Sequence, residues 1–123
     1  MGARSLPAEV ATVKPGDCFE VAGRLVLAVD GVVLVHGRVV GASGPLTGVE
    51  HWHAWVEYDE VVPFPDGRRG ELRLVVDRSN GHDVTLPAEY YYEVGQVRRT
   101  HRYERGQALA QMVRHEHWGP WDD

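Results

Sequence analysis

The strongest constraint on the fold is a series of strand-like segments that follow one another with no helical pattern between them. Residues 32–40 are rich in valine with a break near Gly37, residues 50–58 alternate between apolar and polar side chains, and residues 71–77 form another apolar run. Such segments, bounded by glycine and proline, are typical of strands. Runs of strands without alternating helices favour antiparallel pairing. The sequence therefore predicts an antiparallel sheet.

A helix is predicted before this sheet. Asp17 can be its N-cap, and Glu20, three residues later, completes the pattern of a capping box. Apolar side chains then recur at the spacing of one helix face: Cys18, Val21, Ala22, Leu25 and Val29. The turn signal Asp30-Gly31 follows. The N-terminal element is therefore expected to be a helix that carries Cys18 near its start.

Helices are also predicted after the sheet. Pro87 can begin a short helix through Tyr92, since proline fits the first helical turn, and Gly95 would stop it. Residues 96–103 are expected to form a last strand, and residues 104–117 a C-terminal helix. We therefore predict a single α+β domain over residues 1–123.

Composition excludes several classes of protein. With Lys+Arg 13 against Asp+Glu 18, the net charge of −5 argues against a nucleic-acid binder that neutralises phosphates. No apolar run reaches the length of a membrane span, and the N-terminus lacks the pattern of a signal peptide, so a cytoplasmic location is expected. The single cysteine, Cys18, cannot form an internal disulfide or a multi-cysteine zinc site.

Cys18 is the first candidate for chemistry. In the first turn of a helix, the unpaired backbone N–H groups and the helix dipole favour a thiolate, which is the nucleophilic form of cysteine. The simpler interpretation is a small apolar residue on the buried face of its helix. A lone cysteine in a cytoplasmic protein is more often of this second kind.

The second candidate is the segment His51-Trp52-His53-Ala54-Trp55-Val56-Glu57. On a strand, His51, His53, Trp55 and Glu57 share one face, and the other three residues share the opposite face. A cysteine nucleophile needs an imidazole within hydrogen-bond reach, and His51 or His53 could supply it. The two histidines could instead bind a metal ion, although no third ligand at a recognisable spacing accompanies them.

The third candidate is an acidic residue at the end of the apolar run. Asp77 could begin a turn through its side chain, or it could orient a histidine as the third member of a triad. Asn80 is an alternative for the same role, and Asp77 is preferred because it still belongs to the strand.

Three motifs together resemble a known superfamily. The segments Gly16–Ala22, His53–Glu57 and Val75–Asp77 resemble the papain-like and transglutaminase-core cysteine enzymes, in particular small bacterial or phage-type members. The resemblance covers roughly residues 14–80. It implies a helix bearing the cysteine, packed against an antiparallel sheet that bears the histidine and the acid. It also implies thiol-based acyl transfer without a cofactor.

The resemblance leads to a specific functional hypothesis. Cys18 would be the nucleophile, His53 the base and acid, and Asp77 the residue that orients the imidazole, in an amide hydrolase or acyltransferase such as a peptidase, a deamidase or a transglutaminase-like enzyme. The substrate would be a peptide or protein amide, with His51, Trp55 and Asn80 as the candidates for substrate contacts. No glutamine precedes Cys18, so its own backbone N–H would have to contribute to the oxyanion hole.

Two rival hypotheses accompany this one. The domain could keep the same fold and use its cleft, or its tyrosine and tryptophan side chains, to bind a partner without catalysis. Alternatively, His51 and His53 could form a metal site, which metal analysis of the purified protein would test.

Overall fold

The computed structural model describes residues 17–41, 47–78 and 83–122. It contains a five-stranded antiparallel sheet in the order β4-β3-β2-β1-β5 and three helices. In chain order the elements are α1 (Cys18–Ala28), β1 (Val33–Val40), β2 (Glu50–Pro63), β3 (Arg69–Asp77), β4 (Val84–Pro87), α2 (Ala88–Val94), β5 (Thr100–Tyr103) and α3 (Arg105–His115). The prediction of an α+β class with an antiparallel sheet is confirmed.

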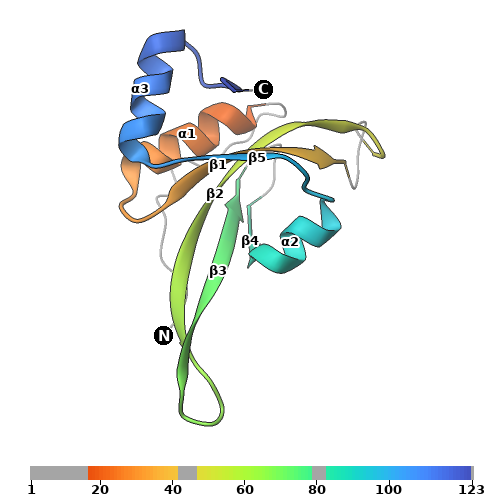
Figure 1. Ribbon diagram of the computed structural model, residues 1–123, viewed down its shortest axis with the longest axis vertical. Helices are drawn as coiled ribbons and strands as arrows, with labels where there is room; N and C mark the ends of the chain where they lie inside the picture. Colours follow the sequence, from red (N-terminus) through yellow and green to blue (C-terminus); the bar gives the residue numbers. More distant parts are fainter. Residues whose placement is uncertain (1–16, 42–46, 79–82, 123) are drawn as a thin grey trace.

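The helices divide between the two faces of the sheet (Figure 1). Helices α1 and α3 share one hydrophobic cluster with Ala54 and Val56 of β2, whereas α2 packs near Trp55 in a separate cluster. Successive residues of a strand point to opposite faces, so the two clusters follow directly from the alternation along β2. The predicted division of this segment into two faces is confirmed.

Several element boundaries differ from those predicted. Strand β2 continues to Pro63 and β3 begins at Arg69, so the two form a long hairpin that extends from the body of the protein (Figure 1). The predicted last strand begins only at Thr100, and β4 was not predicted. Strand β4 has four residues and pairs antiparallel with the end of β3.

Strand β1 is continuous through Gly37, where a break was predicted. A Cβ at this position would lie 2.7 Å from the ring of Trp55. Glycine is therefore required here because the Trp55 ring packs directly on the backbone of the neighbouring strand, and not because the strand ends.

The predicted capping box at α1 is wrong. Asp17 occupies the N-cap position, but the structure shows no capping hydrogen bond from its side chain, and Glu20 instead forms an ion pair of 2.7 Å with Arg24. A capping box is present at α3, where Glu104 and Gln107 bond reciprocally to each other's backbone N–H groups. An i,i+4 pair on the exposed face of α1 competes for the Glu20 carboxylate.

His36 of β1 is enclosed by aromatic rings on the α1 side of the sheet. It is 0% exposed, and its ring centroid lies 4.8–5.1 Å from those of Phe19, Tyr103 and Trp121. Within the described residues, neither ring nitrogen has a hydrogen-bond partner. Burial, with a smaller contribution from His101, lowers the pKa of His36 to about 4, so the imidazole is neutral at pH 7.

We expect His36 to make the protein sensitive to acid. Between about pH 6.5 and pH 4 the unfolded chain binds a proton at His36 that the folded chain excludes, so the free energy of unfolding falls as the pH is lowered. The loss should approach roughly 3 kcal/mol. Urea denaturation across this range should show a shallower pH dependence for His36→Leu than for the wild type. The exposed control His115→Leu should keep the wild-type slope, and an unchanged slope in His36→Leu would contradict this assignment.

Candidate functional site

Cys18 is the first residue of α1. Its side chain is 6% exposed and belongs to the hydrophobic cluster beneath α1. The first N–H groups of a helix have no partner within the helix, so this position combines a positive end of the helix dipole with free backbone donors. The prediction that Cys18 lies in the first turn of a helix is confirmed.

His53 and Asp77 form a buried pair on neighbouring strands. The Nε2 atom of His53 lies 2.8 Å from Oδ2 of Asp77, and each residue is 7% exposed. His53 comes from β2, and Asp77 is the last residue of β3. Asn80, the alternative partner, lies outside the described residues.

The end of β3 leaves His53 accessible to α1. The pairing of β2 with β3 stops at Val56 and Val76, so β3 does not continue alongside His53. The Cys18 thiol approaches the imidazole closely enough to influence its titration. Since Nε2 faces Asp77, the other ring nitrogen, Nδ1, is the one that remains for the thiol.

The charges around His53 determine its protonation state. Burial by itself would lower the pKa of His53, but hydrogen bonding and charge interactions with Asp77 and Cys18 outweigh it and raise the pKa to about 10. The imidazole is therefore protonated at neutral pH. A buried imidazolium between a carboxylate and a thiol is the arrangement that stabilises a thiolate.

Tyr91 of α2 is a fourth component of this cluster, and the sequence did not reveal it. Its hydroxyl donates a hydrogen bond of 2.8 Å to the same Oδ2 atom that faces His53. Burial, and then the nearby Asp77 charge, raise the pKa of Tyr91, so it remains a donor. Three consecutive tyrosines were visible in the sequence, but nothing in their spacing distinguished Tyr91 from the exposed Tyr90.

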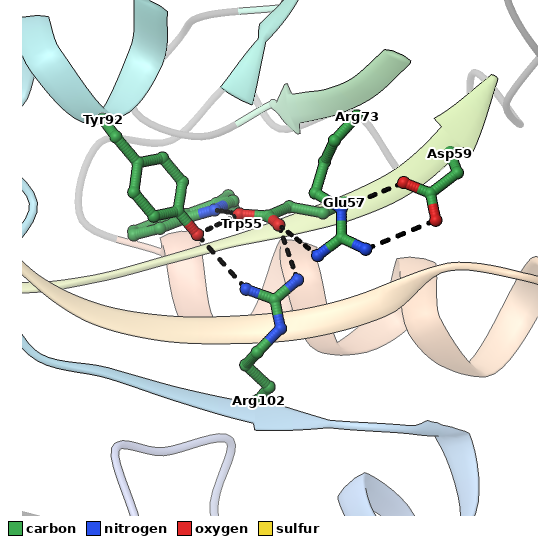
Figure 2. Close-up of polar contacts among 6 residues, drawn as sticks. All are labelled: Trp55, Glu57, Asp59, Arg73, Tyr92 and Arg102. Carbon is green, nitrogen blue, oxygen red and sulfur yellow. Dashed lines mark hydrogen bonds and ion pairs between the residues drawn. The ribbon is translucent and has the colours of Figure 1, made fainter. Parts of the chain in front are cut away.

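A second buried charge, Glu57, ties α2 to the sheet (Figure 2). Glu57 is 1% exposed. Its Oε2 accepts hydrogen bonds from Trp55 Nε1 at 2.8 Å and from the Tyr92 hydroxyl at 2.5 Å, and its Oε1 accepts one from Arg102 at 2.6 Å. Because Tyr92 is adjacent to Tyr91, this network fixes the helix that supplies the donor to Asp77.

Arginines from two strands complete the Glu57 network (Figure 2). Arg102 of β5 also reaches the Tyr92 hydroxyl at 3.3 Å, and Arg73 of β3 lies 3.8 Å from Glu57 while it bonds to Asp59 at 3.0 Å. Arg102 is exposed at the surface of β5. Its guanidinium also neutralises the buried Glu57 carboxylate.

The remaining predicted residues lie close to His53. Trp55 is 1% exposed and lies in the core, so its indole supports the site from within and is not open to solvent. His51 is half-buried, with its Nδ1 atom 3.0 Å from the carbonyl oxygen of Val49. The rings of His51 and His53 are 6.2 Å apart, and the described residues contain no group of three side chains suited to hold a metal ion.

Comparisons with protein-family models, with curated proteins and with solved structures found no match. Among the described residues, no helix has the length and apolar character needed to cross a membrane.

The His53–Asp77 pair leads to a prediction about titration. In Asp77→Asn, burial is no longer offset by a carboxylate, so the pKa of His53 should fall from about 10 to 6.5 or below. Ring-nitrogen NMR spectra recorded against pH would measure this change. In the wild type, the protonated imidazole stabilises the fold fully below about pH 6.5, and this contribution is lost as the pH rises through about 10.

The exposed substitution Asp59→Asn serves as the control for this titration, and it should leave the His53 signal unchanged. A wild-type His53 that already titrates near pH 6.5 would contradict the ion pair.

The Glu57 network leads to a prediction about stability. Glu57→Gln keeps the shape of the side chain but removes the buried charge that Arg102 requires. We expect the free energy of unfolding to fall by roughly 3 kcal/mol, as for other buried pairs that lose one partner. The matched control Asp59→Asn breaks an exposed pair with Arg73 and should cost less than about 1 kcal/mol. If urea denaturation gave equal losses of unfolding free energy for Glu57→Gln and Asp59→Asn, the Glu57 charge would not contribute more to stability than an exposed pair.

Proposed function

We propose that the protein is a cysteine-dependent amide hydrolase or acyltransferase with Cys18, His53 and Asp77 as its catalytic triad, on a papain-like or transglutaminase-like fold. The observation that carries this proposal is the buried imidazole of His53, which has Asp77 at Nε2 and Cys18 within range of its other side. The resemblance of the sequence motifs supports the same assignment. No cofactor takes part in the proposed reaction.

The proposed reaction proceeds through a thioester. The Cys18 thiolate attacks the amide carbonyl carbon, and a new C–S bond forms as the carbonyl becomes an oxyanion. The His53 imidazolium then donates its proton to the leaving nitrogen as the C–N bond breaks. Neutral His53 next removes a proton from water, or from an amine, as that nucleophile attacks the thioester and releases the acyl product and the thiolate. Water gives hydrolysis or deamidation, and an amine gives transfer.

Each supporting group has a defined task in this scheme. Asp77 orients the imidazole and stabilises its charge, and Tyr91 holds the Asp77 carboxylate as a positioning residue. The backbone N–H of Cys18, in the first turn of α1, can donate to the oxyanion. The substrate would be a peptide or protein amide, with the half-buried His51, whose ring is 6.2 Å from that of His53, as a candidate contact.

One observation favours a second candidate, a binding domain of the same fold without catalysis. Cys18 is only 6% exposed, as a structural cysteine would be. In that case the Cys18–His53–Asp77 cluster would stabilise the fold, and the thiol would react slowly with electrophiles.

The reactivity of Cys18 separates these candidates. We expect iodoacetamide to alkylate the thiol readily below pH 7, because the protonated His53 stabilises the thiolate. His53→Ala should slow alkylation at this pH by roughly tenfold or more. His51→Ala is the matched control and should leave the rate nearly unchanged, because residues two apart on a strand are separated by about 6.5–7 Å.

Intact mass spectrometry against time and pH would give these rates. A thiol that reacts only at alkaline pH would favour the binding domain. If His51→Ala and His53→Ala were equally damaging and both released a bound metal, a metal site would replace the triad.

A further inference from the structure

A hollow lined by arginines lies further along the strand that carries His53. It has a volume of about 380 Å³ and is lined by Arg38, Glu50, Arg98 and Arg99. Three guanidinium groups thus surround a single carboxylate, in a chain whose net charge is −5. We refer to this feature as the arginine hollow.

The backbone holds the arginines of the hollow together. Arg38 N donates to the carbonyl oxygen of Arg99 at 2.9 Å, and Arg98 N donates to the carbonyl oxygen of Arg38 at 3.0 Å. These bonds extend the β1–β5 ladder by a further pair beyond Thr100. The backbone atoms that carry the three arginine side chains are therefore held in place by hydrogen bonds.

Glu50 engages two of these arginines. It accepts a hydrogen bond of 2.9 Å from Arg38 and lies 3.5 Å from Arg98. Its hydrogen bond to Arg38, together with the charges of Arg98 and Arg99, lowers the pKa of Glu50. No carboxylate of the described residues is shown paired with Arg99. The hollow thus retains the capacity to bind one more anionic group.

The arginine hollow lies on the face of the sheet that α1 occupies. Arg38 is paired across the strands with Trp52 and lies 5.4 Å from its indole ring. Trp52 and Ala54 are two residues apart on β2, so their side chains point to the same face. On this face Ala54 and Cys18 belong to one hydrophobic cluster. Glu50 precedes His53 by three residues, which corresponds to about 10 Å along a strand. The Glu50 side chain points to the α1 face and that of His53 to the opposite face, so a substrate would reach the hollow from the Cys18 side. An extended peptide covers this distance in about three residues.

We propose that the arginine hollow binds a carboxylate of the amide substrate, two or three residues from the bond that Cys18 attacks. This inference rests on the proposed function and adds a substrate class to it, namely peptides with an acidic group at that distance. A carboxylate fits the paired N–H groups of an arginine, and its single charge suits a hollow in which Glu50 already neutralises part of the positive charge.

Peptide electrophiles provide a direct test. We would compare tetrapeptides that carry either an N-terminal chloroacetyl group or a C-terminal chloromethyl ketone. Each peptide would consist of alanine, with aspartate or asparagine placed at one position at a time. The rate constant for alkylation of Cys18 would be measured by intact mass. At one position, two or three residues from the reactive group, aspartate should be roughly tenfold faster than asparagine. High salt should reduce this preference.

Substitutions in the arginine hollow test whether its arginines cause the preference for aspartate. The double variant Arg98→Gln/Arg99→Gln should lose the preference for aspartate, whereas the matched control Arg24→Gln, on the exposed surface of α1, should retain it. Iodoacetamide is too small to reach the hollow, so its rate should be the same in all of these proteins.

A chloroacetyl peptide with a free C-terminus, compared with its amide, distinguishes a carboxylate at a chain end from an acidic side chain. Faster alkylation caused by either carboxylate supports the proposal.

The outcomes separate this inference from the proposed function. Normal, His53-dependent alkylation by iodoacetamide with equal rates for aspartate and asparagine would overturn the arginine hollow alone. A preference that persists in the double variant would also overturn it, because the carboxylate would then bind elsewhere. Slow alkylation by iodoacetamide that does not depend on His53 would overturn the triad, and the inference with it.

Discussion

Strand β2 buries two ionisable side chains on the same face, His53 and Glu57, and the rest of the structure supplies their partners. A buried charge without a partner costs several kcal/mol, so each of these groups requires an opposite charge at close range. Asp77 at the end of β3 provides one, and Arg102 of β5 provides the other. The two pairs connect the central strand to elements on both sides of it.

Helix α2 is held in place by the same two buried groups. It has seven residues, none of them fully buried, and its Ala88, Tyr91 and Tyr92 pack against the hydrophobic cluster that contains Trp55. Two hydroxyl groups add hydrogen bonds to this packing, since Tyr91 donates to Asp77 and Tyr92 donates to Glu57. The helix therefore supplies hydrogen-bond donors to the two carboxylates, and the same hydrogen bonds help to position the helix.

The two sides of the sheet give opposite properties to the same kind of side chain. His36 lies among aromatic rings, and burial lowers its pKa to about 4. His53 is also buried, but Asp77 and Cys18 raise its pKa to about 10. At pH 7 one imidazole is thus neutral and the other protonated, because Asp77 and Cys18 outweigh the burial of His53, whereas the charge of Asp122 does not outweigh the burial of His36. This difference makes His53, and not His36, the histidine suited to activate a thiol.

Local patterns in the sequence determined the α+β class, the start of α1 at Cys18 and the alternation of His53 and Trp55 with Ala54 and Val56. These features depend on residues close together in the chain, where helical spacing and strand alternation act directly. Gly37 looked like a strand break because the sequence cannot show the ring of Trp55 packed against it. Tyr91 and Arg102 gained their places only in the tertiary structure, because their partners Asp77 and Glu57 lie 14 and 45 residues away in the sequence. Such contacts form between side chains that no local periodicity relates, so only the folded chain could decide them.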